Sequence, residues 1–199
     1  MENDKLDFSP DEQLKIIQEM IEKTKKETAE NGWSLILWGW LIILAIVTSY
    51  GLFWRGLYEY SGWPWAVFMT LGGIITAITE VRYSKKKKVS TYAERAIGWT
   101  WAACGFAMFF IGFIAVPAGI LKGWESITPM ECLIAGIGTV VTAKIIDWNF
   151  MFYMSLLWFV AVISMIFIHP NFHLLIMGIT IIPAYLVPGY ILRNMYKKA

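Results

Sequence analysis

The chain is organised around the stretch Arg82-Tyr83-Ser84-Lys85-Lys86-Lys87-Lys88. It holds the densest positive charge in a sequence that otherwise alternates long apolar runs with short polar gaps. Four consecutive lysines cannot be buried in hydrocarbon, so we expect this segment to be a loop in water. Cytoplasmic loops of membrane proteins carry an excess of Lys and Arg. The stretch therefore predicts a cytoplasmic loop, and its charged residues act as the topology anchor that orients the other segments.

The composition is that of an integral membrane protein. Of the 199 residues, 57% are hydrophobic and 16% are charged, whereas soluble domains have about 45–50% apolar and about 25% charged residues. The apolar excess is concentrated in runs of roughly 20 residues, the length at which a helix crosses about 30 Å of hydrocarbon. We therefore expect one all-α membrane domain over residues 32–199, preceded by a polar head over residues 1–31.

Six membrane-spanning helices are predicted, arranged as three hairpins. Their expected ranges are 33–54, 64–82, 96–117, 129–146, 148–168 and 173–192. With residues 82–88 inside, 15 of the 17 Lys and Arg residues fall on the cytoplasmic side, and only Arg55 and Lys122 fall outside. This bias predicts that both termini are cytoplasmic in a plasma (inner) membrane protein.

Two helix starts carry the sequence of a capping box. Thr91-Tyr92-Ala93-Glu94 precedes the third span, and Thr128-Pro129-Met130-Glu131 precedes the fourth. In such a motif the Thr side chain and the Glu side chain each satisfy a backbone N–H of the first turn. We therefore expect Glu131 near the outer surface, where it either forms a polar cluster with Arg55, Glu59, Lys122 and Glu125 or is simply solvated, as is more common for charges in outer loops.

The polar head is expected to form a cytoplasmic amphipathic helix. Ser9-Pro10-Asp11-Glu12 is a helix start, and an apolar stripe follows at helical spacing. The stripe consists of Leu14, Ile17, Met20 and Ile21. Because acidic residues outnumber lysines on the polar side, an anionic lipid surface is a poor match. Residues 10–30 are therefore expected to dock on protein: the membrane domain of the same chain, a partner, or a second copy.

The even-numbered spans are rich in small residues and the odd-numbered spans in aromatic ones. Gly72 and Gly73 lie in the second span, and Gly136 and Gly138 in the fourth. Small residues allow close packing of helices in lipid. This pattern predicts that the even-numbered spans form the protein-packed centre. The resemblance between the three hairpins indicates either an internal repeat or the shared composition of membrane helices.

The candidates for an intramembrane polar or transport site are Glu80, Lys144, Asp147, Pro183 and Pro188. The three charged residues lie toward the inner ends of their spans, and Glu80 is the best of them. Its alternative role is an interfacial ion pair with a nearby basic residue. The two prolines interrupt the sixth span, as in the broken helices that line transporter sites. Proline is also ordinary in membrane helices, so a simple kink is the preferred interpretation.

No enzyme is predicted, since the chain lacks the motifs of metalloproteases, serine hydrolases and nucleotide-binding proteins. His169 and His173 are four residues apart, but Pro170 and Asn171 between them favour a turn over a metal site. No cofactor, metal or nucleic acid is expected, and Cys104 and Cys132 are interpreted as packing residues.

The segment from Leu14 to Glu22, which leads through Asn31-Gly32 to Leu37-Trp38-Gly39-Trp40-Leu41, resembles small uncharacterised multi-pass bacterial inner-membrane proteins. This resemblance covers the first quarter of the chain and implies no activity and no catalytic residues. The sequence therefore predicts a non-enzymatic membrane protein that acts through protein–protein interaction or assembly by its head. The alternative is a small transporter or channel subunit whose pathway is lined by the even-numbered spans.

Overall fold

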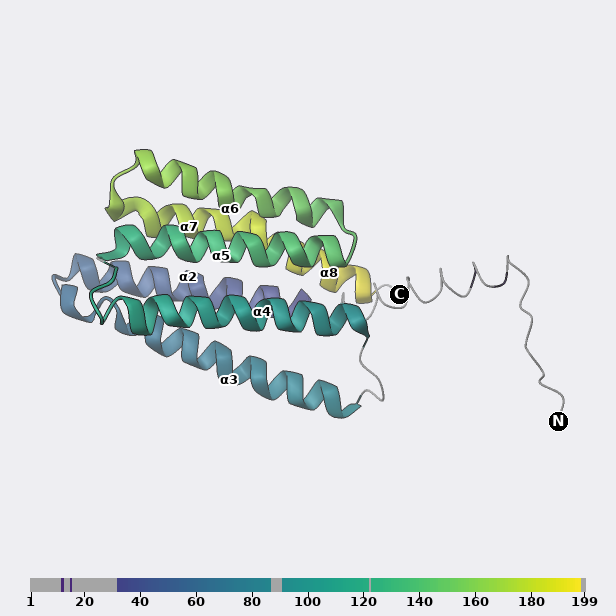
Figure 1. Cartoon of the computed structure of the whole chain (residues 1–199). Coiled ribbons are helices and arrows are strands. Elements are labelled where there is room, and N and C mark those ends of the chain that lie inside the picture. Colours follow the sequence, from purple (N-terminus) through teal and green to yellow (C-terminus); the bar gives the residue numbers. More distant parts are fainter. Residues whose placement is uncertain (1–11, 13–14, 16–31, 87–90, 122, 198–199) are drawn as a thin grey trace.

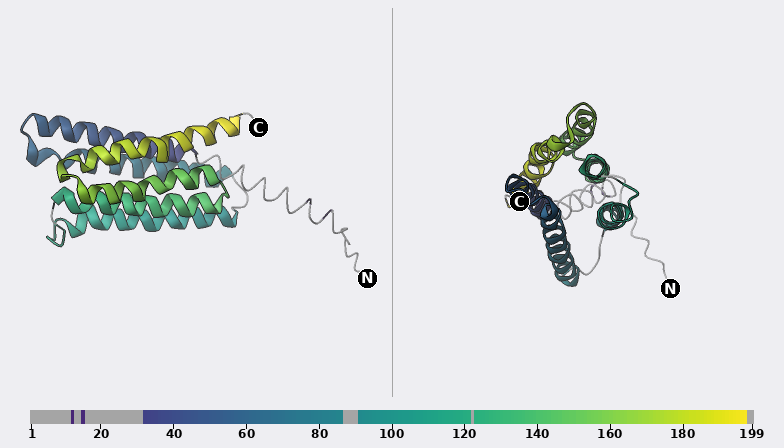
Figure 2. Two further views of the ribbon diagram at one scale, coloured as in Figure 1. Left: turned by 90° about the horizontal axis from the view of Figure 1, so that it is seen from above. Right: turned by 90° about the vertical axis from the view of Figure 1, so that its left-hand side faces the viewer.

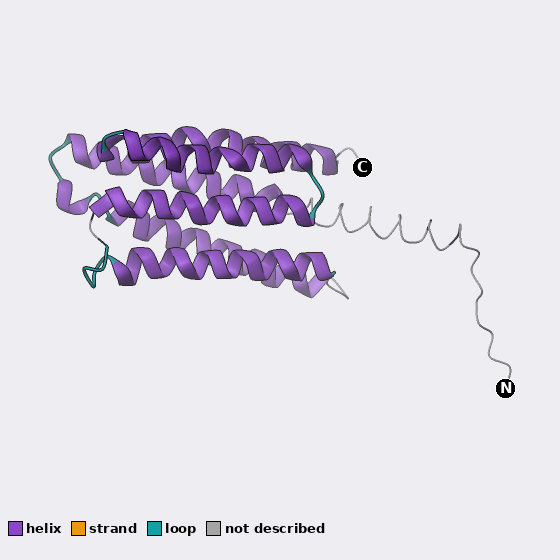
Figure 3. Ribbon diagram, turned by 45° about the horizontal axis from the view of Figure 1, so that its top comes forward, coloured by secondary structure: helices purple, strands orange, loops and turns teal. Residues whose placement is uncertain are grey.

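The structure is a computed structural model that describes residues 12, 15, 32–86, 91–121 and 123–197. Every regular element in these residues is a helix (Figure 3). The α-helices are α2 (Gly32–Trp54), α3 (Trp63–Lys86), α4 (Tyr92–Phe110), α5 (Gly123–Ile145), α6 (Asn149–Phe167), α7 (His173–Ile181) and α8 (Val187–Lys197). The short helices are 3₁₀ turns η1 (Tyr58–Tyr60) and η3 (Pro170–Phe172) and π-helical turns η2 (Ile111–Ala115) and η4 (Ile182–Leu186).

Six helical stretches among the described residues are long and apolar enough to cross a membrane. They are α2, α3 with η1, α4 with η2, α5, α6, and the composite of η3, α7, η4 and α8. The prediction of an all-helical, multi-pass membrane protein is therefore confirmed at the level of helix length and composition. The side of the membrane on which the termini lie stays a prediction.

Three of the membrane helices end in the same way, at a residue with positive φ. Gly56 follows α2, Gly119 follows η2, and Asp147 follows α5. After α5, the Trp148 N–H donates to the Ala143 carbonyl at 2.9 Å and the Asp147 N–H donates to the Lys144 carbonyl at 3.2 Å. This pair of bonds is the Schellman motif, which satisfies the last carbonyls of a helix. Asp147 thus stops α5 and begins the turn to α6.

One of the two predicted capping boxes forms. The Thr91 hydroxyl accepts from the Glu94 N–H, and the Glu94 carboxylate accepts from the Thr91 N–H, both at 3.2 Å. The prediction for Thr128 is wrong, because α5 already begins at Gly123 and Thr128 lies inside the helix. Its side chain is buried, and its hydroxyl has no hydrogen-bond partner. Residues 123–127, which precede Thr128, are therefore helical and do not form a loop.

The lysine-rich stretch is not a loop throughout. The backbone of α3 continues to Lys86, four residues past the predicted end of the second span. Lysine is a good helix former, and a positive charge at the C-terminus of a helix complements the helix dipole. The prediction of a loop is therefore wrong for Lys85 and Lys86, whereas Lys87 and Lys88 lie outside the described residues.

The six spanning stretches alternate in direction along one common axis (Figures 1 and 2). The ends of α3, α5 and α8 and the start of α4 therefore lie at one end of the bundle. Exposed basic residues gather there, and we call this the basic end; its described members are Arg82, Arg95, Lys144 and Arg193. The most extensive helix packing joins α5 and α6, which belong to different predicted hairpins. The division into three hairpins thus stays a prediction.

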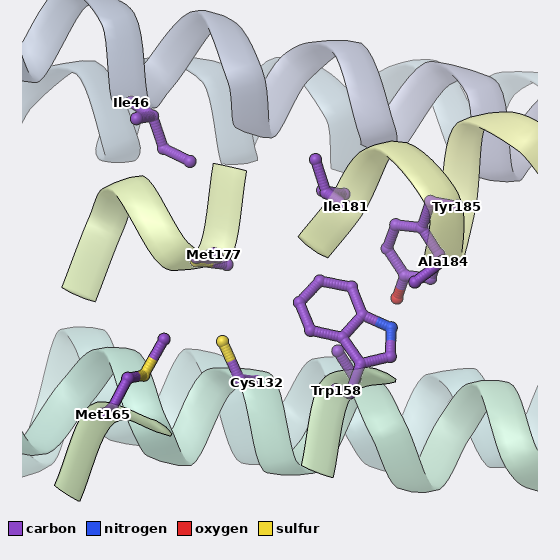
Figure 4. Close-up of a cluster of buried hydrophobic side chains, with 9 residues drawn as sticks. Ile46, Cys132, Trp158, Met165, Met177, Ile181, Ala184 and Tyr185 are labelled. Carbon is purple, nitrogen blue, oxygen red and sulfur yellow. The ribbon is translucent and has the colours of Figure 1, made fainter. Parts of the chain in front are cut away.

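The centre of the bundle is filled by buried apolar side chains from α2, α5, α6, α7 and η4. The cluster consists of Ile46, Cys132, Ala135, Trp158, Met165, Met177, Ile181, Ala184 and Tyr185 (Figure 4). Trp158 and Ile181 have no exposed surface. In lipid, where tails are as apolar as these side chains, close packing and dispersion hold such a centre together.

The position of α3 differs from the expectation. Only 6% of its apolar stretch is buried, against 44% for the fourth and sixth spans and 39% for α2. The helix contacts α2 and lies obliquely at the edge of the bundle (Figure 1). The prediction that even-numbered spans form the centre is therefore wrong for the second span. Of the adjacent glycines Gly72 and Gly73, only Gly72 faces a neighbour, with the Leu41 and Trp38 side chains against it.

Candidate functional site

The most distinctive part of the interior is an aromatic cluster beside the π-helical turn η4. Tyr185 lies on this turn and packs edge-on against Trp158 of α6, with ring centroids 5.3 Å apart and an interplanar angle of 66° (Figure 4). Trp101 of α4 approaches the same tyrosine, with a centroid separation of 6.1 Å. Three helices from different parts of the chain therefore meet at the Tyr185 ring. Edge-on aromatic contacts of this kind add about 0.5–1.5 kcal/mol to the effect of burial.

The turn itself follows from the proline. Pro183 has no N–H to donate, so the regular hydrogen-bond ladder of the sixth span is interrupted there. The interruption takes the form of a π-helical turn over Ile182–Leu186. Such turns frequently occur at functional sites. Pro188 lies one turn further on, within α8, and is fully buried. The two predicted proline candidates thus shape the segment that presents Tyr185.

Two indole N–H groups in this cluster differ in their partners. Trp101 Nε1 donates to the Thr142 hydroxyl at 3.0 Å, and that hydroxyl donates to the Gly138 carbonyl at 2.7 Å. Trp158 Nε1 is buried and has no hydrogen-bond partner. An unpaired buried donor costs about 1–3 kcal/mol. The cluster therefore contains one indole N–H that is hydrogen-bonded, that of Trp101, and one next to Tyr185 that has no partner, that of Trp158.

Glu131 of α5 is a carboxylate near this cluster that sequence reasoning placed elsewhere. Its side chain is half-buried, and it is close enough to Cys132 and Tyr185 to interact with them electrostatically. No hydrogen bond or ion pair joins it to another described residue. The error follows from the incorrect start of α5, because a helix that began at Pro129 would have left Glu131 in its first, solvated turn. A signal was present, since Glu131 directly precedes the apolar run from Cys132.

The three charged residues predicted as an intramembrane site are not brought together. Glu80 is exposed on α3, which does not pack along α5, and no ion pair joins it to another described residue. Lys144 is exposed near the end of α5, where its ammonium lies 4.0 Å from the centroid of the Phe152 ring. Asp147 terminates α5, as described above. The described geometry gives Lys144 and Asp147 local roles at the turn between α5 and α6.

The two histidines form no common site. His173 is buried, and its Nε2 lies 2.9 Å from the Met165 carbonyl and 3.0 Å from the Ile168 carbonyl at the end of α6. Carbonyls only accept hydrogen bonds, so Nε2 carries the proton. His169 is exposed, and its Nδ1 accepts from the Asn171 N–H at 3.3 Å. Within the described ranges, no group of three or more His, Cys, Asp or Glu residues is placed to hold a metal ion.

The two cysteines are free and buried, on α4 and α5 respectively. The Cys104 thiol lies 3.8 Å from the Ile134 carbonyl and packs against Gly138. Both residues therefore serve as small packing groups between helices.

The remaining predicted residues concern docking and topology. Of the topology anchor, Arg82 is exposed at the end of α3. The four residues predicted to dock a partner lie outside the described part of the chain; they are Leu14, Ile17, Met20 and Ile21.

Comparisons with known proteins add no further assignment to this geometry. No protein-family model, no curated protein and no solved structure matches the chain.

Proposed function

We propose that this chain is a non-enzymatic, multi-pass plasma-membrane protein that acts by assembling with other proteins through its cytoplasmic head, residues 10–30. In this proposal both termini are cytoplasmic, and the basic end of the bundle faces the cytoplasm. The head is a separate interaction module joined to a membrane anchor. Its binding partner is a protein surface, because the acidic surplus of the head disfavours anionic lipid.

The observation that carries the proposal is the place at which the head joins the bundle. The head leads into α2 at Gly32, and Gly32 packs against Gly189 and Leu192 of α8, near the basic end. Arg82, Arg95 and Arg193 are exposed at this same end. Gly32, at which the chain continues from the acidic head, therefore lies at the positively charged end of the bundle, and opposite charge favours a docked position that a partner can compete for.

Deletion of residues 1–31 tests the proposal. The full-length chain and the truncated chain are purified from membranes in parallel, and their oligomeric mass and copurifying proteins are compared. The proposal expects at least one specific copurifying protein, or a higher oligomer, that the truncated chain lacks. Identical mass and identical copurifying proteins would exclude assembly through the head.

The position of the head can be tested separately by reversing the charge of Lys85–Lys88. Amide hydrogen exchange in residues 10–30 should become faster when these lysines are replaced by glutamate, because the attraction at the basic end is lost. A control is Lys144→Glu, which also reverses a basic charge at this end of the bundle, but at the end of α5. Unchanged exchange in both variants would show that the head does not rest on the lysine-rich stretch.

A transporter or channel subunit is the second candidate, and the π-helical turn η4 is the observation that favours it. Broken helices present backbone groups and side chains to a substrate near the middle of the membrane. This function expects that Glu131→Gln, Glu80→Gln, or Pro183→Ala combined with Pro188→Ala changes solute flux in liposomes while the fold is retained. The packed apolar centre favours assembly over transport, because it fills the space between the spans with side chains.

A further inference from the structure

We propose that copies of this chain associate within the membrane through a contact between α3 of one copy and α4 of the next. The partner is a second copy because the two faces that complement each other are both supplied by this sequence. This inference concerns the membrane helices and is independent of the head. It therefore goes beyond the function proposed above.

One exposed face of α3 is narrow and consists of small residues, with a glutamate near the basic end. Thr70, Gly73, Ala77 and Glu80 are all exposed and are spaced three, four and three residues apart. Residues at this spacing lie on one side of a helix. A Cβ added to Gly73 would meet no atom within 4 Å, so the backbone is open to close approach there. The side of α3 that packs on α2 is a different one, centred on Gly72.

The exposed face of α4 carries bulky aromatic side chains and has an arginine near the basic end. Arg95, Ala102, Phe106 and Phe109 of α4 and Phe113 of the following turn η2 are all exposed and again follow helical spacing. Phe106 is 69% exposed, and Phe109 and Phe113 stack on each other with ring centroids 5.0 Å apart. The side of α4 that packs on α5 holds Ile97 and Cys104, so the aromatic face is not used within the chain.

The two faces match in charge and in register. Glu80 and Arg95 both lie toward the basic end, and each has a small residue seven positions away along the span, Gly73 and Ala102. Seven residues are two turns of helix, or about 10 Å. When the two charges are level, Gly73 therefore faces Ala102, and Phe106, the first phenylalanine beyond Ala102, faces Thr70. This combination allows close backbone approach and opposite-charge pairing at once.

Lipid tails cover the apolar part of these faces, whereas pairing of the charged part needs an opposite charge. Neither Glu80 nor Arg95 has an oppositely charged residue three or four positions away on its own helix. Glu80 and Arg82 are two residues apart, and residues at that spacing do not face each other. Within one chain, α3 is held by α2, and α4 is held by α5. In a contact between two copies, Arg95 of one copy pairs with Glu80 of the other, and the packing of α3 on α2 and of α4 on α5 is unchanged.

Cysteine crosslinking between two tagged copies tests the contact. One copy carries Gly73→Cys and the other Ala102→Cys, and both are co-expressed as full-length chains in membranes. Mixed dimers should form under mild oxidation only when the two variants are present together. Native Cys104 and Cys132 are buried and should not react in the parent chain. Ile163→Cys, 56% exposed on α6, replaces either partner as the matched control and should give no mixed dimer.

Charge exchange gives a second measurement. Glu80→Arg should reduce the yield of mixed dimer at least fivefold, and Glu80→Arg combined with Arg95→Glu in both copies should restore it. Homodimers of Gly73→Cys alone would show a symmetric α3–α3 contact and would overturn the proposal. So would a crosslink confined to one chain that carries both cysteines, or a monomeric mass for the parent chain in mild detergent and in nanodiscs. Deletion of residues 1–31 should leave the mixed dimer unchanged, which separates this contact from assembly through the head.

Discussion

Gly32 and Gly189 lie so close together that neither position has room for a side chain. A Cβ on Gly32 would stand 2.8 Å from the Gly189 carbonyl oxygen, and a Cβ on Gly189 would stand 3.1 Å from the Gly32 carbonyl oxygen. The two glycines belong to the first and last helices of the described bundle. Close approach of backbones at small residues is a general means of joining helices in lipid. The crossing of α2 and α8 depends on these two residues.

Gly189→Ala should therefore destabilise the bundle. The new methyl group would lie 2.9 Å from Ile36 Cγ1, and α2 and α8 would have to separate to accommodate it. Overpacking of this kind costs about 1–3 kcal/mol. Thermal unfolding in detergent measures the effect. The matched control is Gly51→Ala in α2, where a Cβ meets nothing within 4 Å and the stability should rise by up to about 1 kcal/mol. Equal effects of the two changes would contradict the close crossing.

His173→Phe should destabilise the junction between α6 and α7. The substitution keeps a ring in the buried position but removes the N–H that reaches the Met165 and Ile168 carbonyls. Leaving buried acceptors without a donor costs about 1–3 kcal/mol. Amide hydrogen exchange should accelerate at the start of α7. The control is His169→Ala, at an exposed position, for which exchange and thermal stability should stay at the values of the parent chain.

Trp158→Ala should be one of the most damaging single substitutions in the chain. The side chain projects from α6, is fully buried and packs against α5 and η4, so its removal leaves a cavity. Truncation of a buried tryptophan to alanine costs about 3–5 kcal/mol. Tyr185→Phe keeps the aromatic contact and removes a hydroxyl that makes no hydrogen bond with another described residue, so it should change stability by less than about 1 kcal/mol. If Tyr185→Phe proved as harmful as Trp158→Ala, the hydroxyl would have a partner that this geometry lacks.

Lys144 and Phe152 should show a measurable coupling free energy. The ammonium lies over the aromatic ring at 4.0 Å from its centroid, across the turn from α5 to α6. A cation–π contact at an exposed position contributes about 0.5–1 kcal/mol. A double-mutant cycle with Lys144→Met and Phe152→Leu isolates this contribution from the packing of either side chain. A coupling free energy indistinguishable from zero would mean that the lysine is solvated in the folded protein.

Spans were predictable because their signal is local and strong. Each apolar run has the length that hydrocarbon requires, and the six observed stretches overlap the six predicted ranges throughout. The Thr91 capping box was predictable for the same reason, since all its partners lie within four residues. At Thr128 the same residue pattern occurs inside a helix, because nothing in the local sequence stops residues 123–127 from being helical.

Helix burial was much less predictable, because it depends on which helices meet. Gly72 and Gly73 are adjacent and chemically identical, yet one lies against Trp38 and the other faces outward. Small-residue content therefore predicted a central α3, whereas the structure places it at the edge. The cluster around Tyr185 could not be derived from spacing at all. It joins residues from α4, α6 and η4, and Glu131 of α5 lies close enough to Tyr185 to interact with it electrostatically.

The contact between α2 and the last spanning stretch has a consequence for the order of biogenesis. A multi-pass chain enters the membrane as it leaves the ribosome, so α2 inserts before η4 and α8. Gly39 packs against Leu186 and Gly32 packs against Gly189, so α2 lacks a large part of its packing surface until η4 and α8 have been synthesised. Of the helices that precede them, α3 makes the most extensive contact with α2. A nascent chain that stalls before residue 182 would therefore leave α2 incompletely packed, where quality-control proteases can recognise it.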